Sequence, residues 1–241
     1  MRTTIYKIAL APALLLQGAR LRKTALRLPE ARGPRSGRVG AGDAPVLRVL
    51  FLGDSSAAGV GVESQQEAMP LQAAQRIAAR LGRPVHWRLV ARSGVNTREA
   101  QALLEAHPPE PADIVVCALG VNDVTSQRGA RDFVADYDAL LRCVETRTGA
   151  QHAVISGLPP LHRLPAAPQP LRWYLGQCAA RLDAALRRHC DGRANLRFID
   201  LNDASPLEAA RDGFHPGKSQ YLRWALTVAD EVVMLAGGSA A

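Results

Sequence analysis

The chain has 241 residues, of which 47% are hydrophobic and 22% charged, a composition typical of a globular protein with one substantial domain or two small ones. The formal net charge of +8 lies entirely in residues 1–40, which carry nine Lys and Arg and a single acid, Glu30, whereas the rest of the chain has 21 basic and 21 acidic side chains. A neutral main body with only 5% aromatic residues argues against a nucleic-acid partner.

Residues 1–28 combine an apolar run with basic side chains. The run, residues 5–16, is interrupted by Pro12 and as a helix would reach roughly 18 Å, less than the roughly 30 Å core of a bilayer. A signal peptide fits as well, with residues 1–7 as its basic start and residues 8–16 as its apolar part, although Gln17 makes a poor cleavage site. The basic residues 19–28 equally fit a helix lying in a membrane surface, and a solvated arm is the third interpretation. We expect membrane association or export to the periplasm rather than a freely cytoplasmic protein, with membrane contact through residues 1–28.

Residues 29–45 are rich in Gly, Pro and Arg and are predicted to be a linker. They divide the chain into an N-terminal arm with its linker, residues 1–45, and a folded domain, residues 46–241. Four cysteines occur in that domain, with no CxxC pair and no spacing typical of a metal site. Their redox state stays open.

Beyond the linker, apolar β-type runs alternate with helical patterns. The predicted strands are residues 46–52, 85–91, 113–119, 152–157 and 196–201. Helical periodicity covers residues 71–81, 97–106, 133–144, 171–186 and 222–233. Strands separated by helices predict right-handed crossovers and an α/β fold with a parallel sheet covered on both faces.

Two details of this pattern concern packing and a pocket. The last helix is predicted to bury Leu222, Leu226, Ala229 and Val233. A stiff loop with five prolines follows the fourth strand and is expected to wall a pocket, with His162 and Trp173 as further lining residues. The remaining pocket walls are expected from the loops at residues 57–69, 124–130 and 158–172.

Four polar stretches lie at or beside the carboxyl ends of strands: GDSS at 53–56, ARSGVNT at 91–97, GVND at 120–123 and DGFHPG at 212–217. These ends open on one edge of a parallel sheet, where ligands bind. The stretches are therefore expected to converge, although they are far apart in the chain.

Together these stretches contain what ester hydrolysis requires. A serine hydroxyl needs an adjacent base, and His215 can supply it for Ser55, oriented by Asp212 three residues earlier. The developing oxyanion needs preorganised donors, for which the candidates are the N–H groups of Ser55 and Gly94 and the amide of Asn122. Asp54 and Asp123 are interpreted differently, as structural acids that hold loops through backbone N–H groups.

The four stretches resemble the conserved blocks of the SGNH hydrolases, also called GDSL-type esterases and lipases. The resemblance implies that Ser55, Asp212 and His215 are catalytic and that Ser55, Gly94 and Asn122 form the oxyanion hole, with Ser55 at a helix N-terminus. It also implies a three-layer flavodoxin-like sandwich with a five-stranded parallel sheet, and a hydrolase without metal or cofactor. The chain departs from the family's name at position 56, where serine replaces leucine.

The predicted function is a serine hydrolase that cleaves carboxylic esters, either small-molecule or lipid esters, through a Ser-His-Asp triad and an acyl-enzyme. An acyltransferase using the same site is an alternative. A non-catalytic, membrane-docked binding module is a second, of a different class. A G-x-S-x-G nucleophile elbow is absent from the region of Ser55, where the fifth residue is Ala57. The spacing of Asp212 and His215 also differs from that of the α/β-hydrolases.

Overall fold

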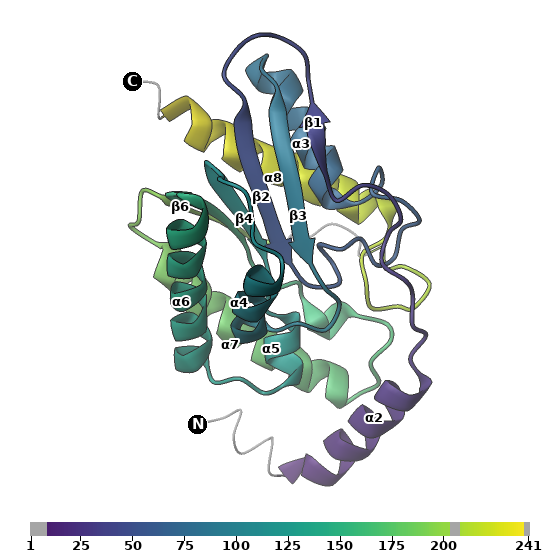
Figure 1. Cartoon of the computed structure of the whole chain (residues 1–241). Coiled ribbons are helices and arrows are strands. Elements are labelled where there is room, and N and C mark those ends of the chain that lie inside the picture. The colour runs from purple at the N-terminus through teal and green to yellow at the C-terminus, as the bar shows by residue number, and fades with distance from the viewer. Residues whose placement is uncertain (1–8, 203–207, 239–241) are drawn as a thin grey trace.

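A computed structural model describes residues 9–202 and 208–238 of the chain. One sheet forms its centre, with the strand order β1-β3-β2-β4-β5-β6 (Figure 1). The five predicted strands are confirmed as parallel neighbours. Their bounds are β2 Leu47–Gly53, β3 Val85–Ala91, β4 Ile114–Ala118, β5 His152–Ser156 and β6 Leu196–Ile199.

The sheet has a sixth strand that the sequence analysis missed. Strand β1, Ser36–Val39, lies in the segment predicted to be a linker and pairs antiparallel with β3, Gly37 opposite Trp87. Its four residues alternate between exposed and half-buried and include no apolar run, so composition offered no signal for a strand. The free backbone groups of the β3 edge provide the pairing partner instead. The sheet is thus six-stranded and mostly parallel, rather than five-stranded and all-parallel.

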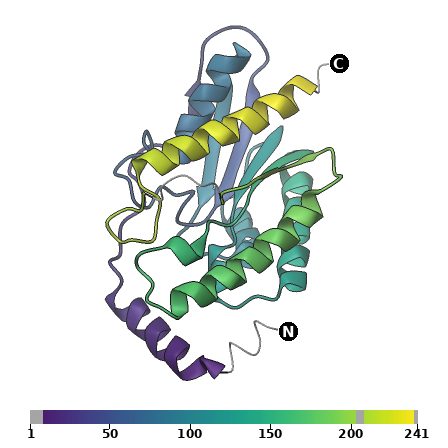
Figure 2. The same ribbon diagram turned by 180° about the vertical axis from the view of Figure 1, so that it is seen from behind.

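Helices cover both faces of the sheet. Helices α3 (Met69–Leu81) and α8 (Lys218–Gly238) pack together on one face, and α8 crosses that face in yellow in Figure 2. The other face is covered by α4 (Thr97–Ala106), α6 (Ala130–Thr148) and α7 (Leu171–Cys190). Two short elements, α5 (Val121–Thr125) and the 3-10 turn η1 (Leu161–Arg163), lie near the carboxyl ends of β4 and β5.

Strand β2 shows how this layering follows from the sequence. Leu50 and Leu52 are buried in the apolar cluster under α4, α6 and α7, whereas Val49 and Phe51 are buried in the cluster under α3 and α8. Side chains of a strand alternate between the two faces. A strand covered on both sides therefore needs an uninterrupted apolar run, and this run fixes β2 in the centre of the sheet.

The buried face of α8 agrees with the prediction at Ala229, which is buried, and at Val233, which packs half-buried against the same cluster, but it differs at the other two positions. Leu222 and Leu226 are 38% and 45% exposed, while Tyr221, Trp224 and Val228 are buried. The predicted buried face did not include the two aromatic residues. Here the Tyr221 hydroxyl donates to carbonyls in the turn after β2, and Trp224 Nε1 donates to Ser156 Oγ at 2.9 Å. Satisfied polar ends allow the larger aromatic surface to be buried.

Helix α2, Ala11–Thr24, lies at the foot of the molecule beside α7 (Figure 1). Its Gln17 side chain donates to the carbonyl of Gln169 at 2.8 Å and accepts from Leu171 N–H at 3.1 Å. Leu14 is buried at this contact, whereas Leu15 and Leu16 are 70% and 72% exposed. Among the residues that the structure describes, none of the helices is both long and apolar enough to cross a membrane.

Candidate active site

Ser55 lies directly after β2, in a series of turns. The predicted helix N-terminus at this residue is wrong, because the first helix after β2 is α3, which begins at Met69. Residues 55–61 instead form tight turns closed by hydrogen bonds such as Val60 N–H to the Ser55 carbonyl at 3.0 Å. Gly59 and Gly61 adopt positive φ of 82° and 109°, a conformation that interrupts a helix. The Ser55 hydroxyl is therefore presented by a turn.

His215 and Asp212 lie in a second turn, which the Asp212 carboxylate holds together. Its Oδ1 accepts from the N–H groups of Phe214 at 2.9 Å and His215 at 3.0 Å. A short bridge between Ala209 and Pro216 closes the turn at its base. The backbone thereby places the acid and the histidine side by side before any side-chain contact is considered.

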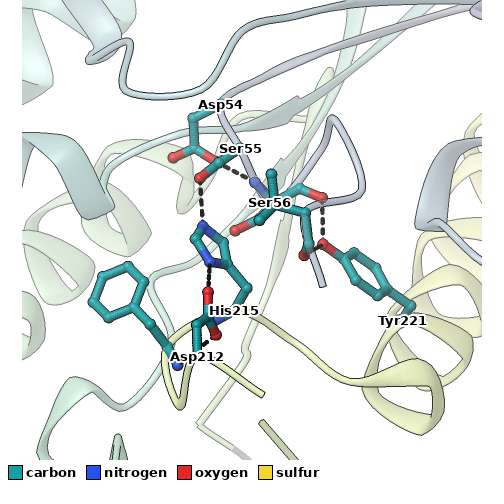
Figure 3. A network of polar contacts seen from close by, with 8 residues as sticks. Asp54, Ser55, Ser56, Asp212, His215 and Tyr221 are labelled. Atoms are coloured by element: carbon teal, nitrogen blue, oxygen red, sulfur yellow. Dashed lines mark hydrogen bonds and ion pairs between the residues drawn. The ribbon is translucent and has the colours of Figure 1, made fainter. Parts of the chain in front are cut away.

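The two turns meet at the three predicted catalytic side chains (Figure 3). Asp212 Oδ2 lies 2.5 Å from His215 Nδ1, and His215 Nε2 lies 2.9 Å from Ser55 Oγ. The imidazole thus bridges carboxylate and hydroxyl through its two nitrogens, an arrangement able to remove the serine proton. Phe214 packs edge-on against the His215 ring with centroids 5.3 Å apart, which restricts the ring's orientation.

The environment of Asp212 keeps its carboxyl group ionised. Burial raises its pKa, but hydrogen bonds from the His215 side chain and from the backbone N–H groups of Phe214 and His215 outweigh this effect. The net pKa is lower than the usual value for aspartate. An ionised carboxylate at this position stabilises a positive charge on His215.

The close approach of the two turns depends on Gly61. A Cβ atom at this position would lie 2.5 Å from the Pro216 carbonyl oxygen and 2.9 Å from Ala210 Cβ. Only a glycine lets the turn after Ser55 rest directly on the backbone beside His215. Position 61 therefore helps to set the distance between the Ser55 hydroxyl and the His215 ring.

Asn122, in the first turn of α5, is joined to the Ser55 turn through its neighbours. Its Nδ2 donates to the Val95 carbonyl at 2.9 Å and to Asp54 Oδ2 at 3.3 Å. Gly94 precedes Val95, is exposed and has φ of 87°. Asn122 thus connects the Gly94 loop, through Val95, to Asp54, the residue before Ser55. Among the described contacts, neither Asn122 nor Gly94 forms a direct hydrogen bond with Ser55.

Asp54 and Asp123 make the backbone contacts expected of structural acids. Asp54 Oδ1 accepts from Ser56 N–H at 2.9 Å, and Asp123 accepts from the N–H and hydroxyl of Thr97 at 3.0 and 2.9 Å. Burial raises the pKa of Asp54 to about 7, and repulsion from Asp123 adds to this effect. Tyr221 also secures the Ser55 turn, because its hydroxyl donates to the carbonyls of Ser56 and Val60.

A cavity of about 150 Å³ opens beside Ser55 and Asn122. One wall is apolar and follows strands β4 and β5: Leu119, Val121, Leu158, Pro159, Pro160, Leu161 and Leu164. The opposite wall is formed by α8: Gln220, Arg223, Trp224 and Thr227. Sequence reasoning missed the wall from α8. The signal that could have revealed it is Trp224, a large aromatic residue with a polar end on that helix.

Several expected pocket walls differ from the observed ones. The loop after β5 lines the cavity as predicted, but among the described residues the loops at 57–69 and 124–130 contribute nothing to it. His162 and Trp173 do not line it either. His162 packs against α7 instead, so closely that a Cβ added to Gly176 would lie 2.5 Å from the His162 Cβ. Leu161 takes the place beside the cavity.

The cysteines and possible metal ligands lie outside this arrangement. Cys117, Cys178 and Cys190 are buried free thiols and Cys143 is a half-buried one. Burial raises the pKa of Cys117 to about 12, which makes it an inert core residue. Within residues 9–202 and 208–238, no group of three or more His, Cys, Asp or Glu side chains is arranged to hold a metal ion.

Comparison with known proteins defines the class to which this fold and site belong. The model of the GDSL-like lipase/acylhydrolase family matches residues 51–223, and the chain belongs to this family. One relative, a GDSL-like esterase of Mycobacterium tuberculosis, is 26% identical over 130 residues. That match covers 52% of this chain and only 40% of the relative's length.

Solved structures share the fold at low sequence identity. A lipase from a goat rumen metagenome superimposes with a TM-score of 0.60 at 17% identity, over 76% of this chain and 96% of that one. A carbohydrate acetylesterase from Sinorhizobium meliloti gives 0.58 at 19% identity, over 78% and 99% of the two chains. Both likenesses confirm the α/β sandwich.

Proposed function

We propose that this chain is a serine carboxylic-ester hydrolase that acts through an acyl-enzyme. The observation that supports this most is the continuous series of contacts from Asp212 through His215 to Ser55, beside a cavity. Membership of a family of lipases and acylhydrolases supports the same conclusion.

In the proposed reaction, His215 Nε2 takes the proton of Ser55 Oγ as this oxygen attacks the ester carbonyl. Asp212 accepts a hydrogen bond from Nδ1–H and stabilises the imidazolium. The imidazolium then protonates the leaving alcohol, and an acyl-serine remains. In the second half, His215 takes a proton from water, whose oxygen attacks the acyl-serine. The acid is released and the Ser55 hydroxyl is restored.

The proposed oxyanion donors are the N–H groups of Ser55 and Gly94 and the amide of Asn122. Both N–H groups of the Asn122 amide already have partners, Val95 at 2.9 Å and Asp54 at 3.3 Å. We assign the N–H with the longer contact, the one toward Asp54, to the developing oxyanion. The contact with Val95 then keeps the amide in place during the reaction.

The proposed substrate carries a short- to medium-chain acyl group. A cavity of about 150 Å³ accommodates a molecule of roughly the size of benzene. The cavity beside Ser55 has this volume, with leucines and prolines on one wall and Gln220, Arg223, Trp224 and Thr227 on the α8 side. An acyltransferase would use the same triad, with an alcohol in place of water as the acceptor. Turnover that rises with added alcohol, and product diverted from free acid to a new ester, would identify that activity.

We further propose that the N-terminal segment contacts an anionic membrane surface. Leu15 and Leu16 on α2 are largely exposed, and four basic side chains follow within residues 20–27 of the same segment. An exposed apolar pair next to clustered positive charge is typical of helices that lie in a lipid interface. Such contact would bring the chain close to lipid esters.

Hydrolysis of p-nitrophenyl esters from acetate to palmitate, by wild type and Ser55→Ala, tests the proposed activity. The variant should lose kcat by about a thousandfold or more, and rates should fall toward the long chains. A phosphonate probe should label the wild type only. Absence of both hydrolysis and labelling in the folded wild type would contradict the hydrolase and favour a non-catalytic binding module.

A further inference from the structure

We infer that Glu30 is a positioning residue for the active site, because its carboxylate orders the loop that carries Gly94. This inference rests on the proposed function, in which Gly94 N–H binds the oxyanion. Glu30 lies outside the stretch matched by the family model, residues 51–223. It is also the only acid in the first 40 residues, among nine basic ones.

The contact between Glu30 and the loop is short and twofold. Glu30 Oε1 accepts from Ser93 N–H at 2.7 Å and from Ser93 Oγ at 2.8 Å. Its other oxygen forms an ion pair with Arg35. Arg35 in turn donates to the Ala91 carbonyl at 2.7 Å. Glu30 and Arg35 therefore both bind the chain where β3 ends and the loop begins.

Few other contacts hold the part of the loop that precedes Gly94. The loop's backbone-to-backbone contacts, Arg92 N–H to the Gly53 carbonyl and Val95 N–H to the Arg92 carbonyl, are both long at 3.4 Å. The short hydrogen bond from Asn122 Nδ2 to the Val95 carbonyl, at 2.9 Å, lies after Gly94. Gly94 itself has φ of 87° and open space where a Cβ would be, so packing does not fix it. Hydrogen bonds to a charged carboxylate are stronger than neutral ones, and Glu30 therefore supplies the main restraint immediately before Gly94.

The segment that bears Glu30 is anchored to the Ser55 turn as well. Ala31 N–H donates to the Ala58 carbonyl at 3.1 Å, and Arg32 N–H donates to the Glu63 carbonyl at 3.0 Å. Gln65, which is fully buried, donates its amide to the carbonyls of both Ala31 and Ala58. The segment therefore spans from the turn carrying the nucleophile to the loop carrying Gly94 and fixes one relative to the other.

Kinetics of Glu30 variants on an ester that the wild type hydrolyses test this assignment. Removal of a complete oxyanion donor costs about 10²- to 10³-fold in kcat, and a donor that is only misdirected should cost less. Glu30→Ala should therefore lower kcat about tenfold while KM changes by less than about twofold. Affinity for butylboronic acid, a probe that adds to serine as a tetrahedral adduct, should fall by a similar factor.

Matched variants separate positioning from a general loss of stability. Glu30→Gln keeps an acceptor oxygen at nearly the same volume and should retain most of kcat. Glu105→Ala, which removes an exposed carboxylate in the last turn of α4, should have wild-type kinetics. Ser93→Ala should lower kcat a few fold. Combining it with Glu30→Ala should lower kcat no further than Glu30→Ala alone, because the Ser93 hydroxyl has then already lost its partner.

Hydrogen exchange of residues 90–96 gives a readout that does not need activity. It should accelerate in Glu30→Ala and stay unchanged in Glu105→Ala. Unchanged exchange would overturn the inference whether or not the chain is a hydrolase. In an active enzyme, unchanged kcat or additive losses in the double variant would overturn it as well, whereas an inactive wild type with accelerated exchange would reject only the proposed function.

Discussion

Two carboxyl groups near Ser55 show how local donors decide the charge of a buried acid. At Asp54 burial dominates, and the hydrogen bond from Ser56 N–H only partly offsets it, so the pKa is raised to about 7. Burial acts in the same direction at Asp212, but the His215 ring and two backbone N–H groups outweigh it. The acid that contacts the histidine therefore stays ionised, while the acid preceding the serine binds a proton near neutral pH.

Replacing Asp54 by Asn should remove part of the pH dependence of stability. An acid whose folded-state pKa is raised binds its proton more tightly when folded, so the free energy of unfolding falls as the pH rises from about 4 to about 7 and levels off above that. Asn cannot ionise. As the pH rises from about 4 to about 7, the free energy of unfolding of the variant should therefore increase relative to that of the wild type. Urea unfolding across the window measures the difference. A constant difference would contradict the raised pKa.

Replacing Asp212 by Asn should abolish most of the activity without unfolding the protein. The amide cannot stabilise an imidazolium and holds the ring in the wrong tautomer, for which a loss of about 10⁴-fold in kcat is expected. Steady-state kinetics on a short-chain ester measure the effect. Asp138→Asn, which removes an acid that pairs with Arg142 at the surface, is the control. A loss of less than tenfold would reject Asp212 as the partner of His215.

At the scale of elements, the site is formed where two irregular turns touch. Strand β2 delivers one turn and the segment before α8 delivers the other, and Gly61 allows their backbones to meet. Helix α8 then secures the first turn through the Tyr221 hydroxyl. Regular elements thus support the candidate catalytic residues from outside, while the turns determine the distances between their side chains.

Replacing Gly61 by Ala should lower activity more than its loss of stability explains. The new Cβ would collide with the Pro216 carbonyl oxygen, and the residue would also be strained by its φ of 109°. We expect kcat and the rate of phosphonate labelling to fall at least about tenfold, since small misplacements of catalytic groups are costly. Gly42→Ala is the matched control, because Gly42 has φ of 114° with nothing within 4 Å. Equal losses of activity in both variants would show that strain alone is responsible.

At the scale of the whole molecule, charge is distributed unevenly. The net charge of +8 is confined to residues 1–40 and the rest is balanced. Helix α2, which forms part of this segment, lies beside α7 and the loop that walls the cavity. Its Gln17 side chain bonds to Gln169 at the end of that loop and to the first residue of α7. Any surface that attracts the positive segment would therefore come to lie on the same side as this loop.

Binding to vesicles tests the proposed membrane contact. Vesicles with anionic lipid should retain the protein at low salt and release it as the salt concentration rises, because each basic residue near the surface contributes about 1 kcal/mol that salt screens. Changing Leu15 and Leu16 to Ser should weaken binding at least tenfold. Changing Leu222 and Leu226 of α8 to Ser, which removes two other exposed leucines, should not. Equal effects of the two pairs, or no salt dependence, would contradict the proposal.

Sequence by itself determined the regular framework and the location of the candidate site. Buried strands of a parallel sheet favour apolar runs. The run is continuous in β4 and in most of β2, and it is interrupted by polar residues such as Arg88 in β3 and Arg197 in β6. The polar stretches that follow those strands, and the turn before α8, were visible as polar motifs that contain glycine. Ser55, Asp212 and His215 could be grouped because the carboxyl ends of parallel strands share one edge.

Only the tertiary structure decided features that depend on a partner distant in the chain. Strand β1 exists because β3 offers a free edge, and Tyr221 can be buried because the turn after β2 offers two carbonyls. Glu30 reaches the Gly94 loop because β1 pairs beside β3 and brings its segment there. A linear pattern reports what a residue prefers on average, whereas these contacts depend on which backbone groups remain unpaired once the sheet has formed.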